Sequence, residues 1–303
     1  MAISRSQLVK ELEPGLNALF GLEYDKYENE HAEIFNEESS DRAFEEEVML
    51  TGFGNAPVKQ EGAAVTFDSA NEAYTARYTH ETVALAFSIT EEAVEDNLYD
   101  RLSARYTRAL ARSMAHTKQI KAANVLNNAF TGGATAGGDG VSLVNTAHPT
   151  TGGGNFSNRN ATDADLNETS LEQAMIDISQ FIDERGLRIA VQGRKLIVPP
   201  QIMFVADRIL NSTLRTGTAD NDINALVNMS MLPEGYRVNH YLTDTDAYFI
   251  MTDAPNGFKQ FVRTPLATAM EGDFDTGNVR YKARERYSFG FSDPRCVYGS
   301  QGS

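Results

Sequence analysis

The chain has 303 residues, of which 41% are hydrophobic and 23% charged, and its net charge is −15. This composition predicts a folded protein of one to three domains, and the negative charge argues against a general nucleic-acid binder. The single cysteine, Cys296, excludes an internal disulfide framework and a cysteine-rich zinc site. Because no apolar run is long enough for a membrane span and the start lacks a signal-peptide core, we expect a soluble protein made in a cytoplasm, with no membrane partner.

The charges are segregated along the chain. Residues 11–50 hold thirteen acids against two basic residues. No acid occurs between Asp100 and Asp139, where the basic residues are Arg101, Arg105, Arg108, Arg112, Lys118 and Lys121. Opposite charges on separate segments can dock one segment onto another, in the same chain or in a neighbour. Two independently solvated faces are the alternative.

Residues 1–45 read as an arm that lies across another surface. A short amphipathic stretch comes first, followed by an acidic, irregular segment with aromatic residues spaced along it. This segment is too polar to form a core of its own, yet its aromatic residues are too regular for a free tail.

Residues 46–89 predict a long β-hairpin, with a first strand near 58–67, a turn near 68–72 and a return strand over 73–89. The alternation of the return strand changes phase between Tyr78 and Val83. Since a strand keeps one parity while one face stays buried, we expect a bulge there, or a tip that packs elsewhere. A ribbon of two strands is poorly stable alone, which indicates a partner surface.

Residues 90–129 predict a helix of nearly forty residues, with Thr90 as its N-cap. One face is apolar, and Arg101, Arg105, Arg108 and Arg112 form a second continuous stripe. At ~1.5 Å per residue the helix would be roughly 55–60 Å long, which suggests a spine across a flat domain.

The rest of the chain alternates between helices and strands after a Gly/Thr/Asn-rich region at 131–165. Helices are expected at 169–185 and 200–212, around a buried strand at 194–199, and a polar loop at 213–222 follows. Further strands are expected near 236–242, 247–252, 258–263, 266–271 and 278–291. In the last strand Val279, Tyr281, Ala283, Tyr287, Phe289 and Phe291 share one face, with Glu285 as the exception, and Arg280, Lys282, Arg284 and Arg286 share the other.

The stretch 144–159, VNTAHPTTGGGNFSNR, has the composition of an active site. However, no Lys-Ser/Thr follows its glycines, so it does not fit a phosphate-binding P-loop. His148 could pair with a distant Asp, but the sequence offers no partner for it, and we interpret it as an ordinary loop histidine. Pro149 and the glycines then indicate a shaped connection beside the spine helix.

Other chemistry is poorly supported. The histidines are scattered, and the segment 163–168 resembles a calcium loop but has Glu168 in place of the required glycine. Cys296 has no obvious base beside it. The cationic strand 280–286 could touch nucleic acid, and salt bridges to acidic partners are the interpretation we favour. We therefore expect no catalytic residues, no metal and no cofactor.

This order of parts resembles the major capsid proteins of tailed bacteriophages, which have the Hong-Kong-97 fold, and NTAHP followed by GG and SN is similar to Mu-like major head subunits. The resemblance implies an α+β fold with an N-terminal arm (1–45), an extended hairpin loop (46–89), a peripheral (P) domain with the spine helix (90–165 and 255–303) and an inserted axial (A) domain (166–254).

The function that the resemblance implies is structural. Subunits would assemble into hexamers and pentamers of an icosahedral shell enclosing double-stranded DNA, bound without sequence specificity, in a virion built in the bacterial cytoplasm. Because this chain has no room for an N-terminal scaffolding region, the resemblance implies a separate scaffolding protein, together with a portal and decoration proteins.

The residues expected to contact neighbouring subunits lie on four elements. Near the hairpin tip these residues are Tyr74, Arg77 and Tyr78. Some members of the family form a cross-link through a lysine of this hairpin, and Lys59 is the only lysine of the hairpin in this sequence. On the spine helix, the arginine stripe would dock an acidic arm or face the interior. The remaining candidates are the loop 213–222 and, in the cationic strand, Arg280 and Arg284.

Two alternatives stay open. One is an encapsulin-like compartment with the same fold around cargo enzyme. The other is a soluble enzyme or glycan-binding protein that uses the loop 145–160.

Overall fold

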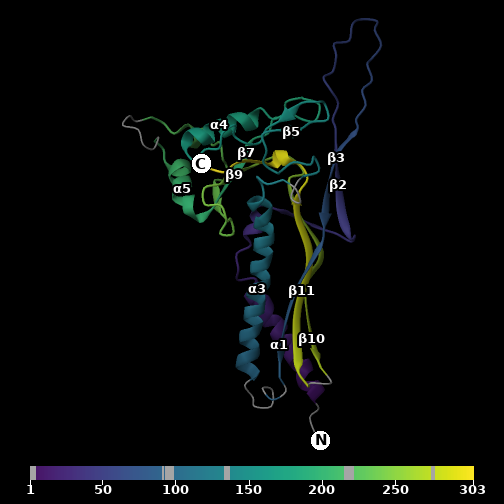
Figure 1. Ribbon diagram of the computed structural model, residues 1–303, viewed down its shortest axis with the longest axis vertical. Coiled ribbons are helices and arrows are strands. Elements are labelled where there is room, and N and C mark those ends of the chain that lie inside the picture. Colours follow the sequence, from purple (N-terminus) through teal and green to yellow (C-terminus); the bar gives the residue numbers. More distant parts are fainter. Residues whose placement is uncertain (1–4, 91, 93–98, 133–136, 215–221, 274–276) are drawn as a thin grey trace.

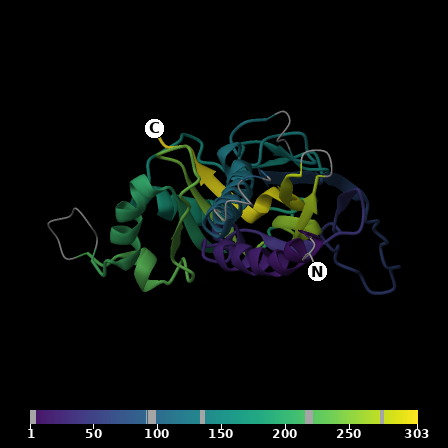
Figure 2. The ribbon, with the colours of Figure 1, turned by 90° about the horizontal axis from the view of Figure 1, so that it is seen from below.

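The computed structural model describes residues 5–90, 92, 99–132, 137–214, 222–273 and 277–303. The chain forms a narrow, elongated part, a compact part beside one end of it, and a hairpin that continues as a long loop beyond both (Figure 1). Seen from below, the molecule is wider than it is thick, and the N-terminal helix lies along one face (Figure 2).

The elongated part is a long sheet with the strand order β1-β10-β11-β4. Strand β1 runs parallel to β10, and the other neighbours are antiparallel. Two helices, α1 and α3, pack together and against this sheet. The bounds are α1 Arg5–Tyr24, β1 Asn36–Ser39, β4 Glu81–Ile89, α3 Tyr99–Asn127, β10 Phe258–Gly272 and β11 Val279–Phe291.

Strand β11 confirms the predicted alternation. Tyr281, Ala283 and Tyr287 are buried, and they pack toward the helices, whereas Lys282 and Arg284 are exposed. Leu16 and Phe20 of α1 and Leu110, Ala111 and Met114 of α3 complete this core. The single acid on the buried face, Glu285, is only 2% exposed and lies 3.7 Å from the ammonium group of Lys118. The exception in the pattern is therefore a buried ion pair.

The compact part is a second sheet, with the order β12-β9-β7-β8, covered by three helices. The predicted strand 194–199 is confirmed as β7, whereas the helix expected over 169–185 ends at Ser179, and the strands expected at 258–263 and 266–271 are one strand, β10. The bounds are α4 Glu168–Ser179, β7 Gly193–Val198, η2 Pro200–Ile202, α5 Met203–Asn211, α6 Ala225–Asn228, β8 Tyr236–Val238, β9 Tyr248–Thr252, η3 Pro294–Cys296 and β12 Val297–Ser300.

The hairpin is real, but its first strand was wrongly placed. Strand β2 (Phe44–Leu50) pairs with β3 (Glu72–Thr79), and residues 51–71, which include the expected strand 58–67, form a loop without strand structure. Polar and apolar residues alternate over 58–67, but no neighbouring strand pairs with this segment. The strand is formed instead by residues 44–50, which span the boundary between the segments that we assigned to the arm (1–45) and to the hairpin (46–89).

The change of phase in the return strand marks a change of sheet. Residues before His80 pair with β2, and residues after it belong to β4, which pairs with β11 from Glu81 opposite Tyr287 to Ile89 opposite Val279. Ala76 and Tyr78 are buried in the first segment and Ile89 in the second. The even-numbered residues of the first segment and the odd-numbered residues of the second are therefore buried in different parts of the core, as the change in the alternating pattern indicated.

The arm lies on its own chain. Helix α1 has 20 residues, longer than the short stretch expected, and the single turn η1 (Glu30–Glu33) leads from it into β1. Phe35 packs between Phe258 and Phe289, with ring centroids 5.3 and 5.0 Å away. The aromatic residues of the arm thus bind it to the elongated part, whereas the predicted start of the spine helix, at 91 and 93–98, lies outside the described residues.

Candidate functional site

The three hairpin residues expected to contact a neighbour lie at the base of the hairpin, not near its tip. Tyr78 is 3% exposed, its ring meets that of Phe261 edge-on at 4.8 Å, and its hydroxyl lies 2.5 Å from Ser292 Oγ. Tyr74 donates from its hydroxyl to the Pro149 carbonyl at 3.0 Å. Both tyrosines therefore join the hairpin to its own subunit, and burial raises the pKa of Tyr78.

Arg77 alone of the three faces outward. Its guanidinium lies 3.9 Å from the centroid of the Phe44 ring and 3.7 Å from Glu46 on the paired strand, and 57% of the side chain is exposed. This cation is available at the surface of the hairpin.

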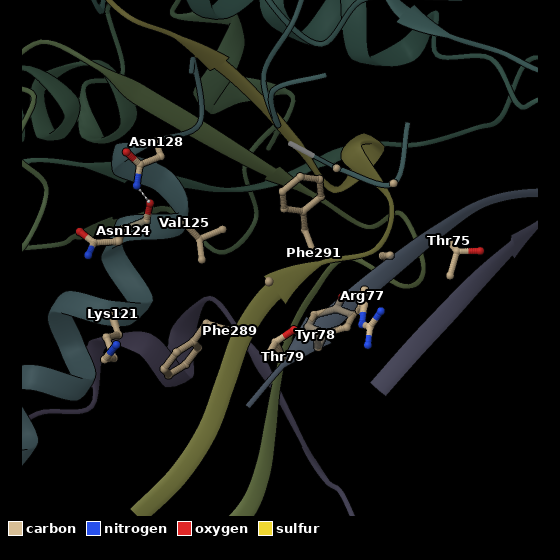
Figure 3. A pocket seen from close by; sticks show the side chains of 14 residues that line it. Thr75, Arg77, Tyr78, Thr79, Lys121, Asn124, Val125, Asn128, Phe289 and Phe291 are labelled. Atoms are coloured by element: carbon tan, nitrogen blue, oxygen red, sulfur yellow. Dashed lines mark hydrogen bonds between the residues drawn. The ribbon is translucent and has the colours of Figure 1, made fainter. Parts of the chain in front are cut away.

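A cavity of about 400 Å³ lies beside the hairpin base, between β3, the last turns of α3 and the end of β11 (Figure 3). Asn124 of α3 and Asn128, just beyond the end of the helix, line it, and β11 contributes Phe289 and Phe291. Arg77 and Lys121 also line the cavity, and Lys121 is paired with Glu81. Amides beside aromatic rings suit a contact surface better than acid–base chemistry.

Two glycines let the hairpin approach the body of the subunit. A Cβ atom on Gly138 would lie 2.7 Å from the carbonyl oxygen of Thr75, and one on Gly290 would lie 2.7 Å from the ring of Tyr78. Both distances are shorter than any side chain tolerates. The direction of the hairpin therefore depends on these two positions.

The loop 51–71 projects away from the rest of the chain (Figure 1). It carries large apolar side chains that its own subunit leaves uncovered: Val58 is 94% exposed and Phe67 95%, and Phe53 and Val65 are also exposed. The base of the loop is fixed by Asp68, which accepts from the Gly54 amide at 2.8 Å and pairs with Arg185 at 2.9 Å. Lys59 lies exposed in this loop, and none of the ion pairs between described residues includes it.

The described part of the arginine stripe is exposed and makes no ion pair with the described side chains of the arm. Arg105, Arg108 and Arg112 all face solvent, and the described ion pairs include none of them; the side chain of Arg101 lies outside the described structure. Described carboxylates of the arm contact other side chains instead: Glu30 hydrogen-bonds with His240, Glu33 pairs with Lys195 and Arg237, and Glu38 pairs with Lys259. Among the described side chains, no carboxylate of the arm pairs with the stripe, and the expected docking of an acidic arm onto it stays a prediction.

His148 is not an ordinary loop histidine. It lies in the short strand β5 (His148–Pro149), paired with β6 (Asn155–Phe156), and it is fully buried. Its Nδ1 lies 2.6 Å from Asp139 Oδ2, and its Nε2 lies 3.1 Å from Asn158 Oδ1. The partner that the sequence seemed to lack is thus nine residues upstream, in the glycine-rich segment.

Both ring nitrogens of this histidine face fixed partners. Asn158 donates from Nδ2 to the carbonyls of Leu143, Pro294 and Val297, so its Oδ1 is the acceptor that faces His148. The Asp139 carboxylate lies against the other ring nitrogen. Both nitrogens are therefore engaged inside the protein, and neither is free to contact a substrate. We name His148, Asp139 and Asn158 the histidine clamp.

A second buried network holds the same loop. The Arg295 guanidinium, 3% exposed, pairs with Glu184 at 2.8 Å and Asp293 at 3.2 Å, and it covers the Phe156 ring at 4.2 Å. Thr151 donates its backbone N–H to Glu184 at 3.1 Å. No local pattern predicts this network, because Glu184 and Arg295 are 111 positions apart in the chain.

No chemistry beyond contacts emerges in the part of the chain that the structure describes. No three His, Cys, Asp or Glu side chains there gather as a metal site. Burial raises the pKa of the Cys296 thiol, which disfavours the reactive thiolate. No described helix is both long and apolar enough to cross a membrane. Most of the loop 213–222, at residues 215–221, lies outside the described residues.

A protein-family model described as "Phage capsid protein" matches residues 73–300. Among solved structures, the capsid of an empty GTA particle has a TM-score of 0.56 and 12% identity, with 90% of this chain and 89% of that chain covered. The capsid of the cyanophage P-SCSP1u gives 0.54 and 11%, covering 88% and 85%. A virus-like particle from Pyrococcus furiosus gives 0.53 and 10%, covering 95% and 98%. No curated protein sequence matches the chain. These likenesses confirm the α+β capsid fold that we expected.

Proposed function

Since the chain belongs to the phage capsid protein family and is a structural capsid protein, we propose that its copies assemble into hexamers and pentamers, and that these form an icosahedral shell around double-stranded DNA. The partners of such a subunit are other copies of itself, a separate scaffolding protein, a portal and decoration proteins. Assembly would take place in the cytoplasm of a bacterial host.

The observation that carries this proposal is the loop 51–71. It holds Phe53, Val58, Val65 and Phe67 away from the core of its own subunit, where they stay in contact with water. Burying such a side chain is worth about 1.5–3 kcal/mol, so a neighbour that covers the loop would be bound strongly. A second copy of the chain is the simplest neighbour. Arg77 and Lys59 are the charged residues of the hairpin that we assign to this contact.

The net charge of −15 suits a container for DNA, because the inner wall must not hold the genome tightly. The arginine stripe would then bind an acidic surface of a neighbouring subunit, or face the interior. Arg280 and Arg284 are assigned to a contact between subunits.

An encapsulin-like compartment is the second candidate, since the virus-like particle from Pyrococcus furiosus has a similar fold. The contents of purified shells separate the two: nucleic acid favours the viral shell, and a co-purifying enzyme favours the compartment. An enzyme that uses the loop 145–160 is disfavoured, because both nitrogens of His148 are engaged in the histidine clamp.

Sedimentation of the purified protein tests the proposal. We expect wild-type protein to sediment as particles of many copies. A variant in which a Gly-Ser linker replaces residues 52–70 should keep the circular dichroism of the folded subunit but sediment as small species. Wild-type protein that stays monomeric at every concentration would contradict the proposal.

A further inference from the structure

The outer face of the long sheet carries a row of cations among small side chains. Along β11 these cations are Arg280, Lys282, Arg284 and Arg286, on the face opposite to the buried Tyr281 and Ala283. On the flanking strands, Ala267 and Ala269 of β10 and Ala84 and Ala86 of β4 lie beside Lys282 and Arg284, and all four alanines are exposed.

The middle of this row has no partner among the described residues. Arg280 pairs with Asp273 at 2.5 Å and lies opposite Glu271, so one end of the row is largely neutralised. At the other end Arg286 is half-buried. Lys282 and Arg284 are exposed, and the ion pairs between described residues include neither. Two adjacent cations on a flat surface of alanines form an accessible anion-binding face.

The arm presents acids on the opposite face of the same sheet. Glu37 lies on β1 opposite Gln260 and, like it, on the helix side of the sheet, near Tyr24, whose pKa is raised by burial first and, to a smaller extent, by the charges of Glu285, Asp25 and Glu37. Both Glu37 and Asp41 are exposed, and no described ion pair includes them, in contrast to Glu38, which binds Lys259. Because β1 is an edge strand, a second molecule can approach these two carboxylates.

The charges of the two surfaces are complementary. Glu37 and Asp41 belong to one short segment at the edge of the sheet, and Lys282 and Arg284 are neighbours on the outer face of β11. Two carboxylates that no described ion pair includes therefore match two cations that no described ion pair includes.

We propose that Lys282 and Arg284 of one subunit bind the acidic edge of a second copy of this chain, through Glu37 and Asp41. The two surfaces lie on opposite faces, so the contact is head-to-tail and can close into a ring. The proposal rests on the proposed shell function and names the charged residues of one contact within it. The other polyanion that could bind the row, DNA, is an outcome of the test below.

Charge exchange tests the pairing. We expect the variant with Lys282→Glu and Arg284→Glu, and separately the variant with Glu37→Lys and Asp41→Lys, to form shells at yields at least about tenfold lower than wild type, because like charges then face each other across the contact. Circular dichroism and thermal unfolding should show both variants folded. The quadruple variant, which returns the net charge to −15, should recover most of the shells.

A matched control distinguishes the loss of the specific charge partners from the change in net charge. Combining the row reversal with Glu172→Lys and Asp246→Lys, two acids of the compact part that lie outside the assigned contacts and that no described ion pair includes, also returns the net charge to −15 but should not recover assembly. Rescue by this control would overturn the assignment to the arm, as would failure of the first exchange to rescue. Row-reversed shells that assemble normally but retain less DNA would assign the row to DNA instead. If wild-type protein forms no shells, the proposed function itself fails.

Discussion

The histidine clamp makes a quantitative prediction about stability. The Asp139 side chain is 6% exposed and His148 is fully buried, so their hydrogen bond is shielded from water and counterions. Asp139→Ala removes a charge-assisted bond, worth about 1.5–3 kcal/mol. The Nδ1 atom of His148 then stays buried without a partner, at a cost of about 1–3 kcal/mol. We expect a loss of about 3 kcal/mol in the free energy of unfolding.

Two variants sharpen this prediction. Asp139→Asn keeps a polar partner, because its amide can donate to Nδ1 while Nε2 still donates to Asn158, and we expect it to cost only about 1 kcal/mol. Asp163→Ala removes a partly exposed ion pair with Arg159 and should also cost no more than about 1 kcal/mol. Urea unfolding of the unassembled protein measures all three. A loss below about 1 kcal/mol in Asp139→Ala, equal to that in Asp163→Ala, would refute the clamp.

Three further predictions address the spine helix, the arm and the hairpin. Charge reversal of Arg105 together with Arg108 should block assembly and leave the subunit folded; unchanged shells in electron micrographs would remove the stripe from the contacts. Burial lowers the pKa of His31 to about 4, below the ~6.5 of the unfolded chain, so unfolded protein takes up the proton first and stability is lost as pH falls from 6.5 toward 4. Through this group, the free energy of unfolding should be about 2 kcal/mol lower at pH 5 than at pH 7. The variant His31→Leu should lack this contribution to the pH dependence. A pH dependence identical to that of wild type would contradict the role of His31. Gly138→Ala should cost about 1–3 kcal/mol, since its Cβ would meet the Thr75 carbonyl, and a wild-type urea midpoint would show that the hairpin base yields easily.

Periodic segments were predictable from the sequence, because the alternation of apolar and polar residues indicates which face of the element is buried. Strand β11 alternates since one face packs on α3, and the phase change near His80 reported the transfer of the chain from one sheet to another. The first strand of the hairpin was misplaced because alternation at 58–67 carries no information about pairing, whereas β2 is hidden among seven residues of which three are acids.

The candidate site was harder to predict, because its groups meet only after folding. The Asp139 partner of His148 lies in a glycine-rich segment without periodicity, and Arg295 reaches Glu184 across 111 positions. Tyr74 and Tyr78 have the composition of a contact surface, but the fold turns them toward their own subunit. The exposure of Arg77 and of the arginine stripe agrees with the expected contacts, which stay predictions until an assembled form is examined.

Electron cryo-microscopy of the purified wild-type protein tests the central claim most directly. We expect closed icosahedral shells of hexamers and pentamers, in which the loop 51–71 of each subunit lies on the next. A protein that remains a monomer, or that forms only open aggregates without symmetry, would contradict the assignment of this chain as the building block of a shell.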